Sequence, residues 1–169
     1  MSENLKIDTS VYIWLVIIVF ITPVAITLIS EFIFTKKITL KIGGFTLLMM
    51  AMITAIFAYQ LQGTKVIIND GRLVLKSLFY SDEVVLDNIL SVESFEQALP
   101  PRYYLIKRIN GIHLPSYFVG KFKTHDKSDA FVLATYPPYL VVTASDNKLY
   151  IISSSNQVEE ALLGFKESQ

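Results

Sequence analysis

Residues 11–34, VYIWLVIIVFITPVAITLISEFIF, form a run of 24 residues whose single charge, Glu31, lies near its end. A second run at residues 42–61, IGGFTLLMMAMITAIFAYQL, has 20 residues and no charge. As helices the two runs span roughly 36 and 30 Å, and the hydrocarbon core of a bilayer is about 30 Å thick. A signal peptide followed by a buried core helix fits less well, because signal peptides have apolar regions of only about 7–15 residues. The two runs therefore predict a hairpin of two transmembrane helices.

The composition of the whole chain agrees with this prediction. Of the 169 residues, 52% are hydrophobic and 18% are charged, whereas soluble domains carry about 25% charged residues. The excess of apolar residues lies in the two runs, and the remainder has ordinary soluble composition. The absence of cysteine excludes zinc ribbons and thiol chemistry. A disordered chain, a disulfide scaffold and a wholly cytosolic domain are all poor interpretations.

The two apolar runs carry features that bear on how the helices pack. Pro23 lies inside the first run and should kink the helix or free a carbonyl, which the Thr27 hydroxyl or the second helix could bind. Small residues spaced 7, 4 and 3 apart form one stripe on the second helix: Gly44, Ala51, Ala55 and Ala58. Such a stripe allows close helix packing in lipid. We expect it to pack the hairpin, and the alternative is that it binds another membrane subunit.

Two spans place both termini on the same side of the membrane, but the flanking bases do not decide which side. The linker between the helices carries three bases and no acid: Lys36, Lys37 and Lys41. The other side carries four bases close to the helices: Lys6, Lys65, Arg72 and Lys76. Basic residues favour the cytoplasmic side of a membrane, and the two sides carry similar numbers of them. The orientation of the hairpin therefore stays open.

A tail at residues 1–10 precedes the hairpin, and residues 62–169 follow it. These residues have the pattern of a mainly β domain. The β-rich segments are short and are separated by turn residues, among them Asn69-Asp70-Gly71 and Asn110-Gly111. The expected strands are 65–68, 72–76, 83–86, 89–92, 103–106, 116–122, 130–134, 139–143 and 148–152. A final helix over 156–165 presents one apolar face, Val158, Leu162 and Phe165. The pattern predicts a meander that forms a sandwich or a small barrel, closed by this carboxy-terminal helix.

One stretch of this domain resembles a known family. Residues 108–122, RINGIHLPSYFVGKF, resemble a run in bacterial pleckstrin-homology-like (PH-like) domains, where a glycine-containing turn and a Leu-Pro step lead into a strand. Residues 83–93 are similar to a strand followed by D-x-I-x-S-V in the same group, and the resemblance extends over about residues 63–166. It implies a PH-like barrel, which in this group is often attached to two membrane helices. It also implies binding or assembly rather than catalysis.

No constellation for catalysis is visible in the sequence. The two histidines, His113 and His125, have no cysteine to pair with, and no nucleophile elbow, zinc-protease motif or P-loop occurs. The sequence offers no clustered metal ligands, so we expect no metal site and no cofactor. We therefore predict that the protein is not an enzyme.

A basic surface is the main candidate for binding. Five bases lie in two neighbouring segments, interleaved with aromatic residues: Arg102, Lys107, Arg108, Lys121 and Lys123. They could attract anionic headgroups, or they could be no more than the solvent face of two strands. Residues 62–169 carry eleven bases and twelve acids, so nucleic acid is not an expected partner. The first hairpin turn, Asn69-Asp70-Gly71, is short and acidic, so phosphoinositide recognition is not expected either.

The sequence also offers a candidate protein contact at Tyr136-Pro137-Pro138-Tyr139, where two prolines restrict the chain. Taken together, these patterns predict a membrane-anchored binding or assembly module. Its expected partners are the lipid bilayer and a protein or a second copy of the chain. The alternative is a subunit or regulator of a larger membrane complex, such as a transporter or an envelope-stress system.

Overall fold

The computed structural model describes residues 1–36, 40–153 and 156–167. The chain forms two compact units: one is Asp8–Leu61, and the other combines Met1–Ile7 with Gln62–Gln169. Of the linker bases considered above, Lys37 and the side chain of Lys41 lie outside the described residues.

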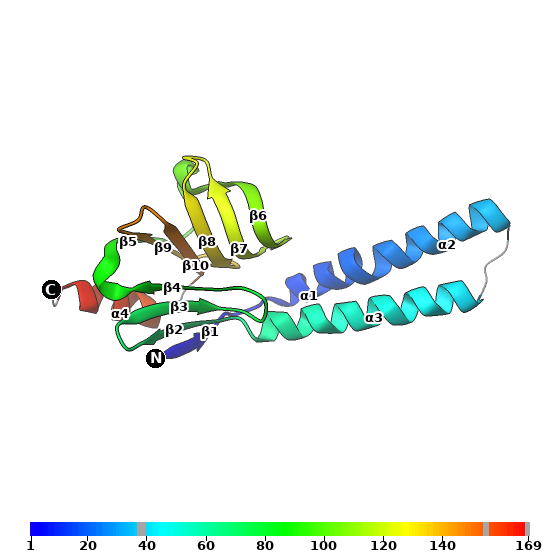
Figure 1. The fold of residues 1–169 in the computed structure, drawn as a ribbon, viewed down its shortest axis with the longest axis horizontal. Coiled ribbons are helices and arrows are strands. Elements are labelled where there is room, and N and C mark those ends of the chain that lie inside the picture. The colour runs from blue at the N-terminus through cyan, green and yellow to red at the C-terminus, as the bar shows by residue number, and fades with distance from the viewer. Residues whose placement is uncertain (37–39, 154–155, 168–169) are drawn as a thin grey trace. The chain divides into compact units, whose positions relative to one another are not determined.

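The first unit is a pair of long apolar helices (Figure 1). Helix α1 (Thr9–Leu15) continues through a π-helical segment, η1 (Val16–Ile21), into α2 (Thr22–Thr35), and α3 (Leu40–Gln62) follows. The side chain of Asp8 accepts a hydrogen bond from the Ser10 amide at 2.8 Å, which caps α1 and lowers the pKa of Asp8. Residues Thr9–Thr35 and Gly43–Gln62 are long and apolar enough to cross a membrane.

The π-helical segment lies directly before Pro23. Proline has no amide proton, so a regular α-helix would lose one hydrogen bond here. The wider turn shifts the pairing, so that the Thr22 amide bonds the Ile17 carbonyl, and the Thr22 hydroxyl bonds the same carbonyl at 2.8 Å. The Thr27 hydroxyl, expected to bind a freed carbonyl, instead bonds the carbonyl of Pro23 itself at 2.9 Å.

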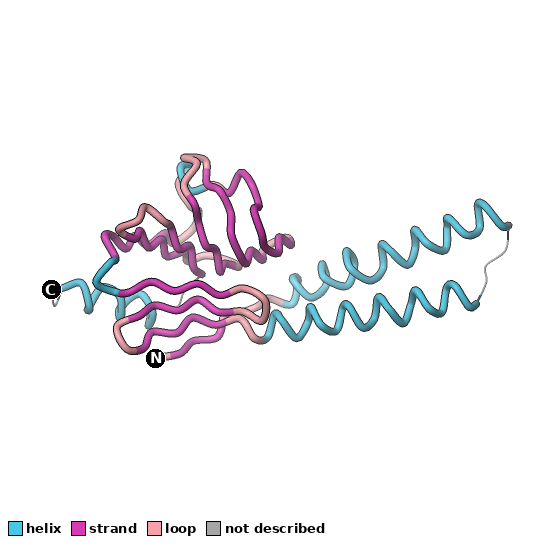
Figure 2. Tube along the Cα trace, in the orientation of Figure 1, coloured by secondary structure: helices cyan, strands magenta, loops and turns pink. Residues whose placement is uncertain are grey.

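The second unit contains two β-sheets and a helix (Figure 2). The first sheet has the order β1-β2-β3-β4, and all its pairs are antiparallel. Its strands are β1 (Ser2–Asn4), β2 (Lys65–Asn69), β3 (Arg72–Lys76) and β4 (Ser81–Val85). The second sheet has the order β5-β9-β10-β8-β7-β6. Its strands are β5 (Ile89–Phe95), β6 (Leu105–Leu114), β7 (Tyr117–Thr124), β8 (Asp129–Ala134), β9 (Tyr139–Ala144) and β10 (Leu149–Ser153).

Strand β1 is the largest difference from the predicted organisation, which treats residues 1–10 as a tail. Residues Ser2–Asn4 pair antiparallel with β2, and the Leu5 amide bonds the Thr64 carbonyl at 2.9 Å. The helical pair is thus inserted between two adjacent strands of one sheet. Both of its ends are joined to that sheet by only a few residues.

The predicted meander and closed barrel are not what the second unit forms. Strand β10 lies between β8 and β9, parallel to β8 and antiparallel to β9, so consecutive strands β8 and β9 are not neighbours. Four consecutive apolar residues of β10, Leu149–Ile152, are buried, as expected for a central strand covered on both faces. Within the described residues no strand pairing joins the two sheets, so the barrel is not closed.

Polar bonds fix one face of the six-stranded sheet to the four-stranded sheet, and we call it the inner face. The Tyr117 hydroxyl lies 3.0 Å from the Thr64 hydroxyl, and the Tyr150 hydroxyl donates to the Glu83 carbonyl at 3.1 Å. Lys148 and Asp82 form an ion pair at 2.5 Å. The predicted carboxy-terminal helix is present as α4 (Asn156–Glu167), with Val158 and Leu162 buried.

Candidate functional site

The opposite, outer face of the six-stranded sheet carries its own apolar cluster. Its buried members come from four strands, β7 to β10, and a short 3-10 helix, η3 (Pro101–Tyr103). They are Tyr103, Phe122, Ala130, Val132, Ala134, Val141, Leu149 and Ile151. Several side chains that pack against this cluster are only partly buried, among them Leu99, Phe118 and Tyr139. The outer face is therefore incompletely covered.

An open groove of about 450 Å³ lies where this cover ends. Its walls are mostly apolar, and its floor is the sheet itself. The lining residues are Gln97, Ala98, Leu99, Tyr104, Leu105, His113, Phe118, Val132, Ala134, Tyr139 and Ile151. The volume lies in the range of about 300–1,000 Å³ that is typical of small-molecule sites.

The segment before β6 that forms one wall of the groove is held by a single carboxylate. Glu93 on β5 accepts a hydrogen bond from the Tyr103 hydroxyl at 2.8 Å and pairs with the Arg102 guanidinium at 2.6 Å. Burial, together with the bond to the Glu93 carboxylate, raises the pKa of Tyr103. The Phe95 ring packs edge-on against Tyr103 at 5.9 Å. The wall is therefore fixed at its base, next to the groove.

A few polar groups mark the rim of the groove. The His113 ring packs at a tilt against Phe118 with centroids 4.5 Å apart, and His113 is exposed. The Tyr139 hydroxyl donates to the Thr135 carbonyl at 3.2 Å, and burial raises the pKa of Tyr139. An apolar cleft with a few fixed polar groups can bind an apolar group and orient it.

The structure does not bring the five predicted basic residues together as one surface. Arg102 is neutralised by Glu93, and Lys123 pairs with Asp129 at 2.9 Å. Lys107, Arg108 and Lys121 have no ion pair among the residues that the structure describes. The predicted patch therefore reduces to three uncompensated bases.

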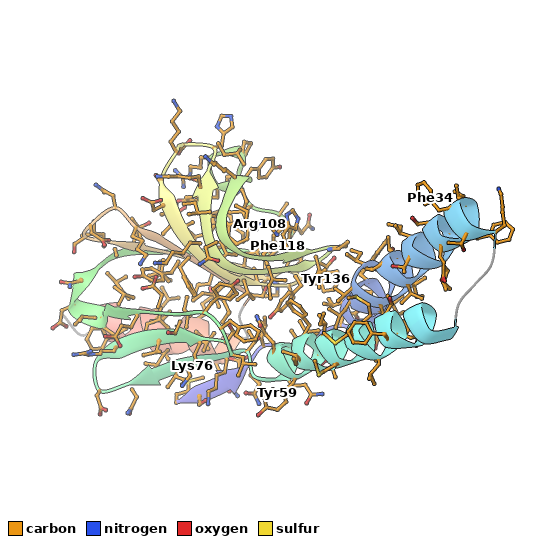
Figure 3. The ribbon with its side chains drawn as sticks, turned by 45° about the vertical axis from the view of Figure 1, so that its right-hand side comes forward. Phe34, Tyr59, Lys76, Arg108, Phe118 and Tyr136 are labelled. Carbon is orange, nitrogen blue, oxygen red and sulfur yellow. The ribbon has the colours of Figure 1, made fainter. Side chains whose placement is uncertain are left out.

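These three bases point to both faces of the β6–β7 hairpin. Opposed residues of an antiparallel pair share a face. Lys107 is opposite Lys123 and Lys121 is opposite Asn110, whereas Arg108 is opposite Phe122 of the outer apolar cluster. Of the three, only Arg108 shares a face with the groove, and Figure 3 labels Arg108 on β6 and Phe118 on β7.

Gly111 lies within strand β6 and not in the turn that its Asn110-Gly111 context predicts. It is opposite Gly120 of β7, and the actual turn comes after Leu114, with Ser116 at a φ of 60°. A Cβ on Gly120 would lie 2.4 Å from the Asn110 carbonyl oxygen, and one on Gly111 would lie 2.4 Å from the Val119 carbonyl oxygen. Gly120 and Gly111 therefore both permit the close approach of the two strands.

The small-residue stripe of α3 does not form the contact within the helical pair. Gly44, Ala51 and Ala55 are exposed, and Ala58 is half-buried. Gly43 is instead the buried glycine, where an added Cβ would lie 3.3 Å from the Leu28 side chain, and Gly44 has nothing within 4 Å. The packing glycine is therefore one residue away from the predicted one.

The groove itself was missed by sequence reasoning. Of its aromatic side chains, Tyr104 and Phe118 lie in the segments of the predicted basic surface, and Tyr139 lies in the candidate protein contact at residues 136–139. The available signal was the run of consecutive apolar residues in 130–134, 139–142 and 149–152, which gives the sheet two apolar faces. Among the described residues no group of three or more His, Asp or Glu side chains could hold a metal ion.

The fold and the groove define a class: a mostly β domain, carried by two apolar helices, with an apolar cleft on its outer sheet face. A comparison with protein families matches residues 64–162 to the bacterial PH domain. The match covers more than half of the chain, so the chain belongs to the bacterial PH domain family, as the resemblance of residues 108–122 implied. No curated protein and no solved structure matches the chain.

Proposed function

We propose that this protein is a non-enzymatic, membrane-anchored module that binds a ligand or assembly partner in the groove of its PH domain. The observation that carries the proposal is the groove of about 450 Å³ on the outer sheet face. Its apolar floor and fixed wall suit an apolar group, and Arg108 on the same face suits a negative charge beside it. The two apolar helices supply the anchor by spanning the bilayer.

The connection between helices and domain supports a role at the membrane surface. Strands β1 and β2 pair with each other, and each is joined to a helix by only a few residues. A chain extends by at most about 3.6 Å per residue, so such tethers hold the domain near the membrane. Ligands that reach the groove would come from the bilayer or from proteins within it.

Site-specific photocrosslinking of the full-length protein in membranes tests this proposal. A benzophenone amino acid replaces Tyr104, which lines the groove and is 52% exposed, or Asp70 in the exposed β2–β3 turn as a control. We expect a defined adduct from position 104 and none from position 70.

A blocking variant makes the result specific to the groove. Ala98→Trp places an indole into the groove from its exposed rim and should abolish the adduct. Gln157→Trp, at an exposed position of α4, should leave the adduct unchanged. An adduct from position 104 that survives Ala98→Trp, or no adduct at all, would overturn the proposal.

A second candidate function, a subunit of a larger membrane complex, is favoured by the exposed stripe of α3. Gly44, Ala51 and Ala55 are not used within the helical pair and are free to pack against another helix. The double change Ala51→Leu and Ala55→Leu should disperse crosslinked assemblies in membranes. Met52→Leu with Ile56→Leu is the matched control on the same helix, and survival of the assemblies in both variants would rule out this candidate.

A further inference from the structure

The two hairpin turns at opposite ends of strand β3 have contrasting chemistry. The β2–β3 turn has Asp70 and Gly71 at its tip, at φ values of 49° and 70°, which is ordinary for a tight turn. The β3–β4 turn, residues 77–80, has Leu78 and Phe79 at its tip, which are 46% and 55% exposed. Turn tips normally carry Gly, Asn, Asp, Ser or Pro, so two large apolar residues here are unusual.

The apolar tip is held in a fixed shape by its flanking residues. The Ser77 amide donates to the Tyr80 carbonyl at 2.7 Å, and the Tyr80 amide donates to the Ser77 hydroxyl at 3.2 Å. Ser77 is only 3% exposed. The turn is therefore anchored at its base, while its tip displays Leu78 and Phe79 to the surroundings.

The register of the sheet places this tip at a particular edge. Asn4 is opposite Lys65, Lys65 is opposite Lys76, and Lys76 is opposite Ser81. This rung is next to Leu5 and Thr64, where the chain leaves the sheet for the first helix and re-enters it after the second. We call this end of the four-stranded sheet, with the 77–80 turn, the tether edge.

The charged residues of the four-stranded sheet also differ between its two ends. Lys6, Lys65 and Lys76 lie at the tether edge and have no ion pair among the described residues. At the opposite end, the Leu86 amide bonds the Gly71 carbonyl at 2.8 Å, which brings η2 (Leu86–Asn88) with Asp87 against the turn that carries Asp70. One end of the sheet is therefore basic and apolar, whereas the other carries Asp70 and Asp87 beside the Arg72–Glu83 ion pair and the N-terminal ammonium.

We infer that the tether edge inserts into the interface of the bilayer that holds the helices, with Leu78 and Phe79 among the lipid chains. Aromatic and aliphatic side chains flanked by lysines are the residues that bind at this depth, because the lysines reach the anionic headgroups. The opposite end has no such run of uncompensated lysines, and its Asp70 and Asp87 are repelled by the same headgroups. The inference rests on the membrane anchoring in the proposed function and adds a second, tertiary contact between the domain and the lipid.

The chain lacks cysteine, so single cysteines can be labelled without background. Three variants of the full chain, Leu78→Cys, Asp70→Cys and Ile26→Cys, are labelled with an environment-sensitive fluorophore in vesicles of mixed neutral and anionic phospholipid. Ile26 is 62% exposed on α2 and reports whether the helices span the bilayer. With a quencher attached to the lipid chains, we expect several-fold stronger quenching at positions 26 and 78 than at position 70.

The possible outcomes separate this inference from the anchoring. Quenching at 26 with equal values at 78 and 70 overturns the inference and leaves the anchor in place, whereas no quenching at 26 overturns the anchor itself. A probe at 78 that is shielded from aqueous iodide but not quenched from the lipid would mean a protein contact, including a second copy, and would also overturn the inference.

A charge series tests the role of the lysines. Lys65→Gln with Lys76→Gln should remove most of the extra quenching at position 78 that anionic lipid gives over neutral lipid. Arg72→Gln removes a charge from the other end of β3 and should leave that difference unchanged. Equal losses in the two variants, or no dependence on anionic lipid, would contradict the inference.

Discussion

The two faces of the six-stranded sheet are both apolar, yet they are covered in different ways. The inner face is closed by the four-stranded sheet and by directed polar bonds, such as those of Tyr117 with Thr64 and Lys148 with Asp82. Among the described residues, the segment before β6 packs on part of the outer face, and the groove beside it is open. Polar bonds in a buried interface specify one arrangement of the sheets. The comparison therefore supports the proposal that the inner face contributes stability and the outer face binding.

The pair of strands β6 and β7 contributes to both faces, and a substitution within it gives the largest expected effect on stability. In Gly120→Ala the new Cβ would lie 2.4 Å from the Asn110 carbonyl oxygen and 2.6 Å from the Cα of Gly111, at a φ of 119°. Because backbone atoms cannot move aside, we expect a loss of about 3 kcal/mol or more in the free energy of unfolding, or failure to fold. Denaturant titration of the full chain in detergent measures it.

Gly71→Ala is the matched control for this prediction. Gly71 also has a positive φ, 70°, but an added Cβ would have no neighbour within 4 Å. We expect it to cost only about 1 kcal/mol, the ordinary penalty of a left-handed backbone. If both variants lose the same stability, the loss in Gly120→Ala comes from its positive φ and not from the close approach of β6 and β7.

The polar bonds of the inner face should contribute to the free energy of unfolding. The side chains of Lys148 and Asp82 are 24% and 14% exposed, so Lys148→Met leaves a largely buried carboxylate without its partner. We expect a loss of about 2 kcal/mol, below the full cost of breaking a buried pair because both groups keep some solvent. The double variant Lys148→Met with Asp82→Leu should regain most of it. Lack of recovery would contradict the assignment of the loss to a stranded charge.

The same contact predicts weaker stability in alkali. Burial is the largest single influence and would lower the pKa of Lys148, but the hydrogen bond that Lys148 donates to Asp82, together with the nearby Tyr150 and the Asp82 charge, outweighs it and the net pKa is raised. Burial raises the pKa of Tyr150. A group whose pKa is raised in the folded state stabilises that state fully at pH values below its unfolded pKa, which is about 10 for Lys148 and for Tyr150. This contribution is lost as the pH rises through the folded pKa. The free energy of unfolding should thus fall by an amount on the order of 1 kcal/mol above about pH 10. Denaturant titrations across this range should show a shallower fall in Lys148→Met; an equal fall would exclude the pair as its source.

The sequence predicted the parts of this comparison that depend on local pattern. The two apolar runs predicted the helices, the Asn69-Asp70-Gly71 turn predicted the β2–β3 hairpin, and Val158 and Leu162 predicted the buried face of α4. These features depend on residues close in the chain, where periodicity and turn chemistry decide the structure.

Long-range pairing could not be predicted in the same way. Strand β1 pairs with β2 across the whole helical insertion, and β10 enters between β8 and β9. Neither pairing has a local signal, because any short apolar or mixed strand can join several neighbours. The same reason explains the candidate site. Lys107 and Arg108 take opposite faces by the ordinary alternation of a strand, and which face each one takes depends on the long-range register of β6 with β7, which shifts on either side of this pair.

That pair of adjacent bases supplies the smallest effect on stability and the sharpest test of the outer face. Arg108 and Lys107 are both exposed and have no ion pair among the described residues, so Arg108→Gln and Lys107→Gln should each change the free energy of unfolding by less than about 0.5 kcal/mol. If the groove binds a ligand with a negative group, Arg108→Gln should lower the crosslink yield from position 104, because Arg108 shares the outer face with Phe122. Lys107→Gln removes the same charge from the same strand on the other face and should leave the yield unchanged. Equal losses of crosslink yield would mean that the ligand responds to the net charge of the β6–β7 hairpin. The two faces would then not differ in how their charges affect binding.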